Sequence, residues 1–200
     1  MQRYNRKSAP KVRGGEVQKK NRWDLTPNYY NTTPKQLIID RQKPGDGHRH
    51  LLKKKDLYDF IEIIPEWEDL AKGLRAIVLA TAQWGLMGWH DYGVIGLCAW
   101  ERSIVWDDCH PDFYEEHKEI FEKLNIPCTR NKDRYIIGFD VESAKAFQLI
   151  HILIHELGHH HDRMTTKSQE DAARGEHYAE NYARRFEDEI LKVYQRRFRF

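Results

Sequence analysis

The sequence predicts an α+β fold in which a short twisted sheet packs on a buried helix and on a C-terminal helix. Residues 147–157 are apolar around almost the whole helix circumference, which is typical of a helix buried on every side. Residues 75–81 and 134–139 are short runs rich in β-formers, as expected for strands. Large apolar side chains recur every four residues from 178 to 198, which predicts a helix with one packed face.

Turn signals divide the chain between residues 65 and 106. Residues 65–73 begin with a proline and predict a helical turn. Residues 84–92 contain two glycines and an aspartate, and we expect them to form a loop. Residues 93–100 and 103–106 predict the two strands of a hairpin, which turns near 99–102.

Two helix starts follow in the second half of the chain. Residues 111–124 predict an amphipathic helix, because a proline and several acids stand in the first turns and apolar positions recur at helical spacing. Residues 107–110 are acidic, and we assign them to the segment that leads into this helix. Asp140 is expected to cap the buried helix, with Glu142 favoured by the helix dipole and the helix ending near Asp162.

The buried helix carries the motif H-E-x-x-H, formed by His155, Glu156 and His159. On a helix the two histidines project from one face, where their ring nitrogens can reach one ion about 2 Å away. Glu156 lies beside that ion, where a general base takes a proton from an activated water molecule. Two imidazoles and a later carboxylate suit Zn2+. The motif also arises by chance on helices that bind nothing, but the apolar surroundings and a downstream acid argue against chance here.

A third ligand is available in the segment from 175 to 186. Glu176 and Glu180 share one helix face, so Glu176 is the favoured ligand and Glu180 the favoured hydrogen-bond partner of a ligating histidine. His177 remains the alternative, because three histidines also make a sound zinc site. The pattern H-E-x-x-H-x-x-G-x-x-H is excluded, since Asp162 and Thr165 stand where it requires glycine and histidine.

The motif H-E-L-G-H followed by E-x-x-A-E-N-Y-A, residues 176–183, resembles the zincin metallopeptidases whose third ligand is a glutamate, and most closely the ImmA/IrrE-type family. The resemblance covers about 45 residues. It implies a zincin-like fold, zinc held by His155, His159 and Glu176, and Glu156 as the catalytic base. Glu180 departs from the pattern, because relatives usually carry Asn or Asp there; the longer acid affects the position behind the ligands and not the zinc ligands themselves.

Several neighbouring positions have a structural interpretation. His151 lies four residues before His155, and we expect a core histidine rather than a distal ligand. His160 and His161 point elsewhere and are expected at the cleft edge or the surface. Gly158 lacks a Cβ and is expected to let another backbone approach beside the metal.

Charge is distributed unevenly along the chain. Residues 1–55 hold 15 Lys and Arg against four Asp and Glu, a balance of +11, and the remaining residues sum to −9. We therefore expect residues 1–50 to form a basic N-terminal arm, flexible over 1–22 and lying along the body over 23–50, and residues 51–200 to form the metallopeptidase domain. Such an arm suits an anionic partner such as nucleic acid, or it docks on the acidic body.

The sequence also leads to expectations about the cellular compartment and the partners of the protein. Cys98, Cys109 and Cys128 show no disulfide framework, and the chain has neither a signal-peptide core nor an apolar run long enough to span a membrane. We expect a cytoplasmic protein without a membrane partner. The oligomeric state does not follow from the sequence.

Two functions are consistent with these features. The first is a zinc metallopeptidase that hydrolyses a protein or peptide substrate with Glu156 as base. The candidates for the group that stabilises the oxyanion formed during hydrolysis are His177, Tyr178 and Tyr135. The alternative is a nucleic-acid-associated regulator or DNA-linked protease, in which the basic arm binds DNA and the zinc site is structural or sensory. An intact general base argues for the first, because a structural zinc site has no use for one.

Overall fold

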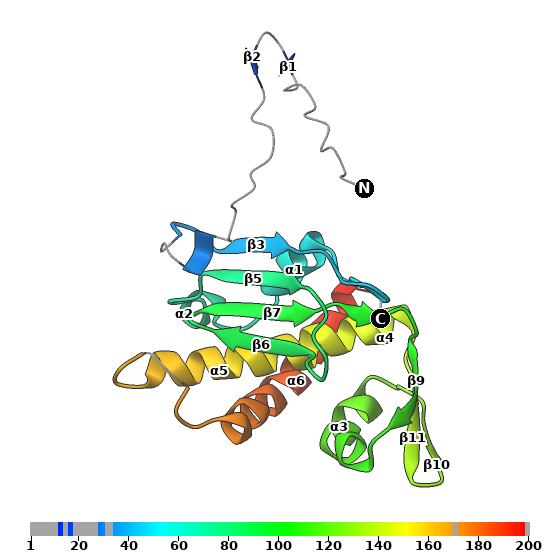
Figure 1. The fold of residues 1–200 in the computed structure, drawn as a ribbon. Helices are drawn as coiled ribbons and strands as arrows, with labels where there is room; N and C mark the ends of the chain where they lie inside the picture. The colour runs from blue at the N-terminus through cyan, green and yellow to red at the C-terminus, as the bar shows by residue number, and fades with distance from the viewer. Residues whose placement is uncertain (1–11, 14–15, 18–27, 31–33, 170–171, 199–200) are drawn as a thin grey trace, which may run out of the picture.

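The computed structural model describes residues 12–13, 16–17, 28–30, 34–169 and 172–198. They form an α+β fold, as predicted (Figure 1). The strands are β1 (Val12–Arg13), β2 (Glu16–Val17), β3 (Ile38–Arg41), β4 (His48–Arg49), β5 (Ala76–Ala80), β6 (Gly88–Asp91), β7 (Val94–Cys98), β8 (Trp100–Glu101), β9 (Val105–Cys109), β10 (Cys128–Asn131) and β11 (Arg134–Gly138). The helices are η1 (Asn28–Tyr30), α1 (Lys54–Ile61), α2 (Trp67–Leu70), α3 (Pro111–Lys123), α4 (Val141–Ala146), η2 (Phe147–Leu153), α5 (Ile154–Thr165) and α6 (Glu176–Phe198).

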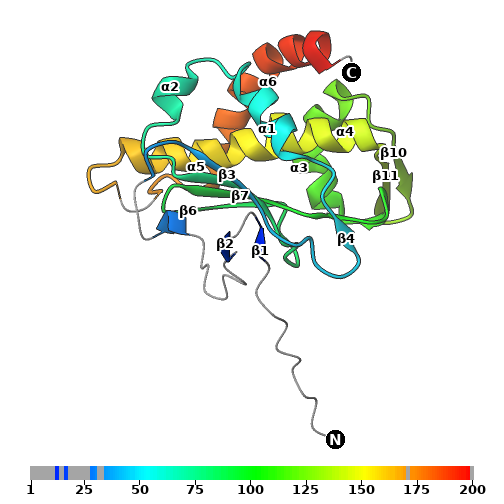
Figure 2. The same cartoon turned by 90° about the horizontal axis from the view of Figure 1, so that it is seen from above.

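The main sheet has the strand order β3-β5-β7-β6. β3, β5 and β7 are parallel, and β6 runs antiparallel to β7 at the edge of the sheet. All residues of β5 are buried, which confirms the strand predicted over 75–81. Figure 2 shows the long α4–α5 rod against one face of this sheet, with α6 on the far side of the rod. The layers are therefore a sheet, a buried helix and an outer helix.

The buried helix is one rod built from three segments. Asp140 caps it as predicted, because its Oδ1 accepts a hydrogen bond from the Ser143 backbone N at 2.7 Å. The π-helical segment η2 follows α4, and every residue in it is buried. α5 then carries the H-E-x-x-H motif and continues to Thr165, three residues beyond the predicted end. A rod that is apolar all round lies between two layers, as its sequence indicated.

The region from 84 to 106 differs from the prediction. Residues 88–91 form the edge strand β6 instead of a loop, and the hairpin joins β6 to β7 through a turn at Tyr92-Gly93, where both residues have positive φ. The hairpin predicted to turn near 99–102 is wrong. β8 pairs with β4, and β9 pairs with β11 in a second sheet. The glycines in this segment favoured a loop, but Gly88 is a strand residue that lies close to Glu156 of the buried helix.

The second sheet, in the order β10-β11-β9, forms a small unit with α3 beside the main sheet (Figure 1). The helix predicted over 111–124 and the strand predicted over 134–139 are both confirmed. Residues 105–109, in contrast, are strand β9, and His110 is the N-cap of α3. Stacked and edge-on rings join this unit to the main core; they belong to Trp100, Trp106, Phe113, Phe121, Phe139 and Phe147.

The folded body extends further towards the N-terminus than the boundary placed at residue 51. β3 pairs with β5 inside the main sheet, β4 pairs with β8, and Tyr29 is 2% exposed. Pairing to strands distant in sequence overrode the loop-like composition of this segment. Most of the arm predicted over 1–22 lies outside the described residues. Among the residues described, no helix has the length and apolar character to cross a membrane.

Candidate metal centre

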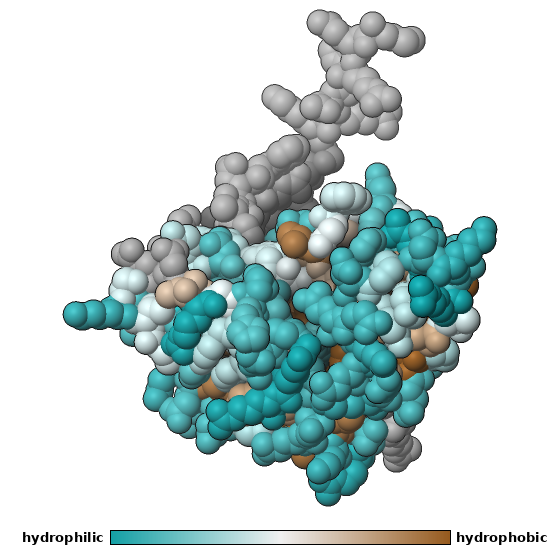
Figure 3. Space-filling view, turned by 90° about the horizontal axis from the view of Figure 1, so that it is seen from below, coloured by the Kyte–Doolittle hydropathy of each residue, from teal (hydrophilic) through white to brown (hydrophobic). Residues whose placement is uncertain are grey.

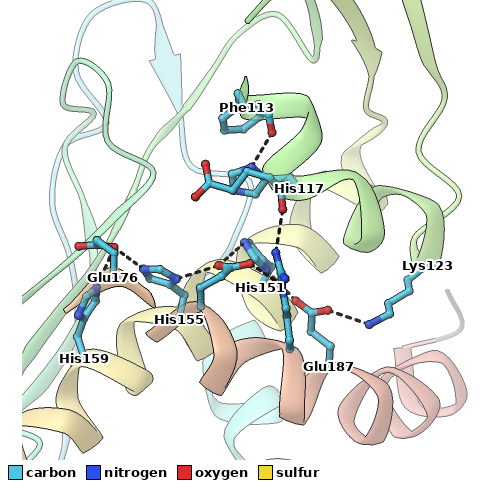
Figure 4. A network of polar contacts seen from close by, with 11 residues as sticks. Phe113, His117, Lys123, His151, His155, His159, Glu176 and Glu187 are labelled. Atoms are coloured by element: carbon cyan, nitrogen blue, oxygen red, sulfur yellow. Dashed lines mark hydrogen bonds and ion pairs between the residues drawn. The ribbon is translucent and has the colours of Figure 1, made fainter. Parts of the chain in front are cut away.

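His155 and His159 on α5 and Glu176 at the start of α6 converge on one point (Figure 4). Glu176 Oε2 lies 3.2 Å from His155 Nε2 and 3.3 Å from His159 Nε2. Among the described residues, these three side chains form the group whose ligand atoms all lie within 4.8 Å of one another. The structure thus brings together the three residues that the sequence proposed as metal ligands.

Close packing of α6 on α5 positions Glu176. A Cβ on Gly158 would lie 2.8 Å from Ala179 Cα and 3.0 Å from Ala179 O, so only glycine permits this separation of the helices. Ala179 and Ala183 are fully buried in the same interface. The prediction that Gly158 admits another backbone is confirmed, and the small residues of α6 explain how it comes so near.

Asp162 fixes the loop that leads into α6, a role that sequence reasoning missed. Its carboxylate is completely buried, and its Oδ2 accepts hydrogen bonds from the backbone N of Arg174 at 2.6 Å and of Gly175 at 3.2 Å. The Arg174 side chain adds an ion pair at 2.9 Å. Because Gly175 directly precedes Glu176, this tether sets where the third ligand stands. No local pattern indicates this role, because its backbone partners lie 12 and 13 residues further along the chain.

Glu180 stands behind His155, as its spacing from Glu176 predicted. Its Oε2 lies 3.4 Å from His155 Nδ1, and its Oε1 accepts from Arg184 Nε at 3.0 Å. Burial would raise the pKa of Glu180, but the hydrogen bond with His155 and the electrostatic effects of His151 and Arg184 lower it to about 2. Glu180 is therefore an ionised acceptor, which is the usual partner of a metal-ligating histidine.

Glu156 is 6% exposed and packs beneath the edge strand. A Cβ on Gly88 would lie 2.6 Å from Glu156 Oε1, so the glycine makes room for this carboxylate. Burial raises the pKa of Glu156 to about 7; Glu176 adds to the shift and His155 opposes it. Such a carboxylate is able to exchange protons near neutral pH.

A cleft of about 620 Å³ opens over these residues. β6 forms one wall, Glu116 and His117 of α3 line the other, and the proposed ligands lie between them. The view from below, on the side of α3 and the start of α6, shows a mainly hydrophilic surface with small separate apolar patches (Figure 3). His90 on β6 and His117 are cleft residues that sequence reasoning did not select, because no local pattern connects them to the motif.

Other candidates lie away from the ligands. The His177 ring pairs with Asn181 at 3.1 Å and is not in the metal-capable group. Tyr178 OH lies 2.7 Å from His161 Nδ1, and Tyr135 stacks on Tyr114 with ring centroids 3.8 Å apart. The residues that line the cleft include none of the three oxyanion candidates, His177, Tyr178 and Tyr135.

Two of the histidines that flank the motif, His151 and His160, are buried and have different partners. His151 is buried and its Nδ1 lies 2.8 Å from Glu187 Oε1, as expected for a core histidine. The expectation that His160 lies at the cleft edge or surface is wrong, because it is 1% exposed. Its Nε2 donates to Lys72 O at 2.9 Å, and its Nδ1 lies 3.3 Å from His90 Nε2. Burial is the main cause that lowers the pKa of His160 to about 4 and that of His90 to about 3.

Comparison of the chain with protein-family models, with curated proteins and with solved structures found no match. The case for a metal centre therefore depends on the geometry of the site itself.

Proposed function

We propose that the protein is a zinc-dependent metallopeptidase. The observation that carries the proposal is the convergence of His155, His159 and Glu176 beside a buried carboxylate, Glu156, at the floor of an open cleft. Two histidines and one glutamate are a ligand set found in catalytic zinc sites, which keep a further position for water or substrate. A structural zinc site is typically closed by four protein ligands.

The donor set fits the ion that it is proposed to hold. Both histidines direct Nε2 towards the Glu176 carboxylate, and the other ring nitrogen of His155 faces Glu180. This arrangement, in which a carboxylate orients a ligating imidazole, is typical of zinc proteins. When bound, the ion would lower the pKa of a water molecule and polarise the carbonyl of a peptide bond.

The chain's own groups would supply the proton transfer and the substrate alignment. Glu156 would take a proton from the attacking water and pass it to the leaving amine, since its carboxylate lines the cleft beside the proposed ligands. β6 is an edge strand along the cleft, so its unpaired side would hydrogen-bond an extended peptide backbone. The proposed substrate is therefore an extended segment of a protein or a peptide.

The metal content of the purified protein tests the ligand assignment. We expect about one zinc per chain. Glu176→Ala should lose most of the metal, whereas the matched neighbour His177→Ala should retain it, because His177 pairs with Asn181 instead. Loss of zinc from His177→Ala and retention by Glu176→Ala would reverse the assignment.

A peptide-library cleavage assay tests the reaction. Glu156→Gln preserves the size of the side chain and removes the base, so this variant should keep zinc and fold while hydrolysis falls by several orders of magnitude. Cleavage at the wild-type rate by zinc-loaded Glu156→Gln would exclude the proposed mechanism.

The charge balance of +11 over residues 1–55 favours a second candidate, a DNA-associated protein in which the arm contacts phosphates. Truncation for this test should remove residues 1–22 only, because β3 belongs to the main sheet. If the arm binds DNA, the affinity of the full chain should fall steeply with salt and the truncated chain should bind weakly. Equal binding by both chains would remove this candidate.

A further inference from the structure

An ion pair with a buried carboxylate lies beyond His151, on the side away from Glu176 (Figure 4). The Glu187 carboxylate is 1% exposed; its Oε2 accepts from Lys123 Nζ at 3.1 Å and its Oε1 lies 2.8 Å from His151 Nδ1. Lys123 also contacts Glu119 at 2.9 Å and Asp188 at 3.1 Å. Buried charges cost free energy that an apolar pair of the same size would not, so their value has to be sought in what they position.

His151 connects this pair to the metal centre. With Nδ1 donating to Glu187, its Nε2 lies 3.9 Å from Glu180 Oε2, which is beyond hydrogen-bond distance but within the range of an ion pair when this nitrogen also carries a proton. The same Oε2 lies 3.4 Å from Nδ1 of His155. One carboxylate oxygen thus stands between the buried His151 ring and the ring of a proposed ligand.

The His151 ring has little freedom to move. It stacks on Phe147 with centroids 5.2 Å apart and an interplanar angle of 18°, and His117 packs edge-on against it at 5.0 Å. It belongs to η2, and π-helical turns frequently occur at functional sites. Its ring and that of His155 are 6.3 Å apart, and His151 is not in the group that could share one ion. His151 is therefore placed to act on the ligand through Glu180.

We propose that His151 is a positioning residue, held by the Lys123–Glu187 ion pair, that fixes the Glu180 carboxylate against His155 and so orients this ligand ring. The inference rests on the proposed function, because it assigns a role to residues around the same zinc site. It also ties the cleft wall to the metal centre, since Lys123 is the last residue of α3 and this helix carries Glu116 and His117.

Zinc affinity, measured by competition with a chelator, tests the role of His151. In His151→Phe the ring stays but its nitrogens are lost, and in Glu187→Gln the charge is lost at constant size. Both should bind zinc more weakly, by up to the about 10- to 100-fold that removal of a direct partner of a ligating histidine costs, because Glu180 is that partner and loses its support in both. His161→Phe is the matched control on the same helix, and its affinity should equal that of the wild type.

Two further readouts separate positioning from a merely structural role. The visible spectrum of the Co2+-substituted protein reports ligand geometry, and it should change in His151→Phe and not in His161→Phe. Lys123→Met should weaken zinc binding while Lys123→Arg restores it, because only the positive charge is needed. Lys123 is partly exposed, so we expect its variants to fold. They therefore test the positioning role even if His151→Phe does not fold.

The outcomes are distinguishable from failure of the proposed function. A wild type that binds no zinc would overturn both. A wild type that binds zinc and loses it in His155→Ala, with affinity and cobalt spectrum unchanged in His151→Phe and Lys123→Met, would overturn the positioning role alone.

Discussion

Replacing Gly158 by alanine should uncouple the metal site from an otherwise intact fold. The added Cβ would lie 2.8 Å from Ala179 Cα, about 0.6 Å short of the 3.4 Å at which contact becomes ordinary. The obstacle is backbone, so α6 has to move away from α5. Glu176 starts α6 and would move with it, whereas His155 and His159 would stay on α5.

Two opposing terms set the stability change. Overpacking of a core contact costs about 1–3 kcal/mol. Alanine gains about 1 kcal/mol over glycine in a helix interior. The net loss should be about 0–2 kcal/mol, which corresponds to a melting temperature lowered by at most about 8 °C for a chain of this size.

The effect on zinc should be larger than the effect on stability. Metal–ligand distances tolerate deviations of about 0.2 Å, and the required movement exceeds this. Zinc affinity should therefore fall by about tenfold or more, measured by chelator competition beside a thermal melt. Gly138→Ala is the control, because its Cβ would meet nothing closer than 3.6 Å. If Gly158→Ala had the same zinc affinity and melting temperature as the wild type, the close approach of α5 and α6 would be refuted.

Two further predictions concern the neighbour of Glu156 on β6 and the N-cap of the buried rod. Gly88→Ala places a Cβ 2.6 Å from Glu156 Oε1, so peptide hydrolysis should fall at least about tenfold while zinc content is retained, and loss of zinc instead would show that the strand itself had moved. Asp140→Ala should lower the unfolding free energy by about 1 kcal/mol at pH 7, with Asp140→Asn as the capping control. Hydrogen bonds from Ser143 hold the pKa of Asp140 below 3.8, so the wild type's advantage over the alanine variant is present above that pH and should be lost as the pH falls below it. Urea unfolding at several pH values measures this difference, and an advantage that does not change with pH would argue against an ionised cap.

The sequence by itself determined the features that depend on local patterns. His155 and His159 are four residues apart, and so are Glu176 and Glu180. This spacing fixes which side chains share a helix face, and the structure places these residues together. Asp140 could be read as a cap because capping needs only a few consecutive residues. Strand β5 could be recognised because its run of apolar residues is short and continuous.

Only the tertiary structure decided the features that depend on partners distant in the chain. β3 looked like part of an arm until its pairing with β5 placed it in the sheet, and β6 looked like a loop because its Gly88 serves the contact with Glu156. His160 was expected at the cleft edge or the surface, but it is buried and its ring contacts His90, on a strand 70 residues earlier. The pairing of His151 with Glu187 on α6 was equally out of reach. The periodicity of apolar residues in the sequence indicates which face of a helix or strand is buried. Strand register and the packing between elements are set by contacts between residues far apart in the sequence, which no short segment contains.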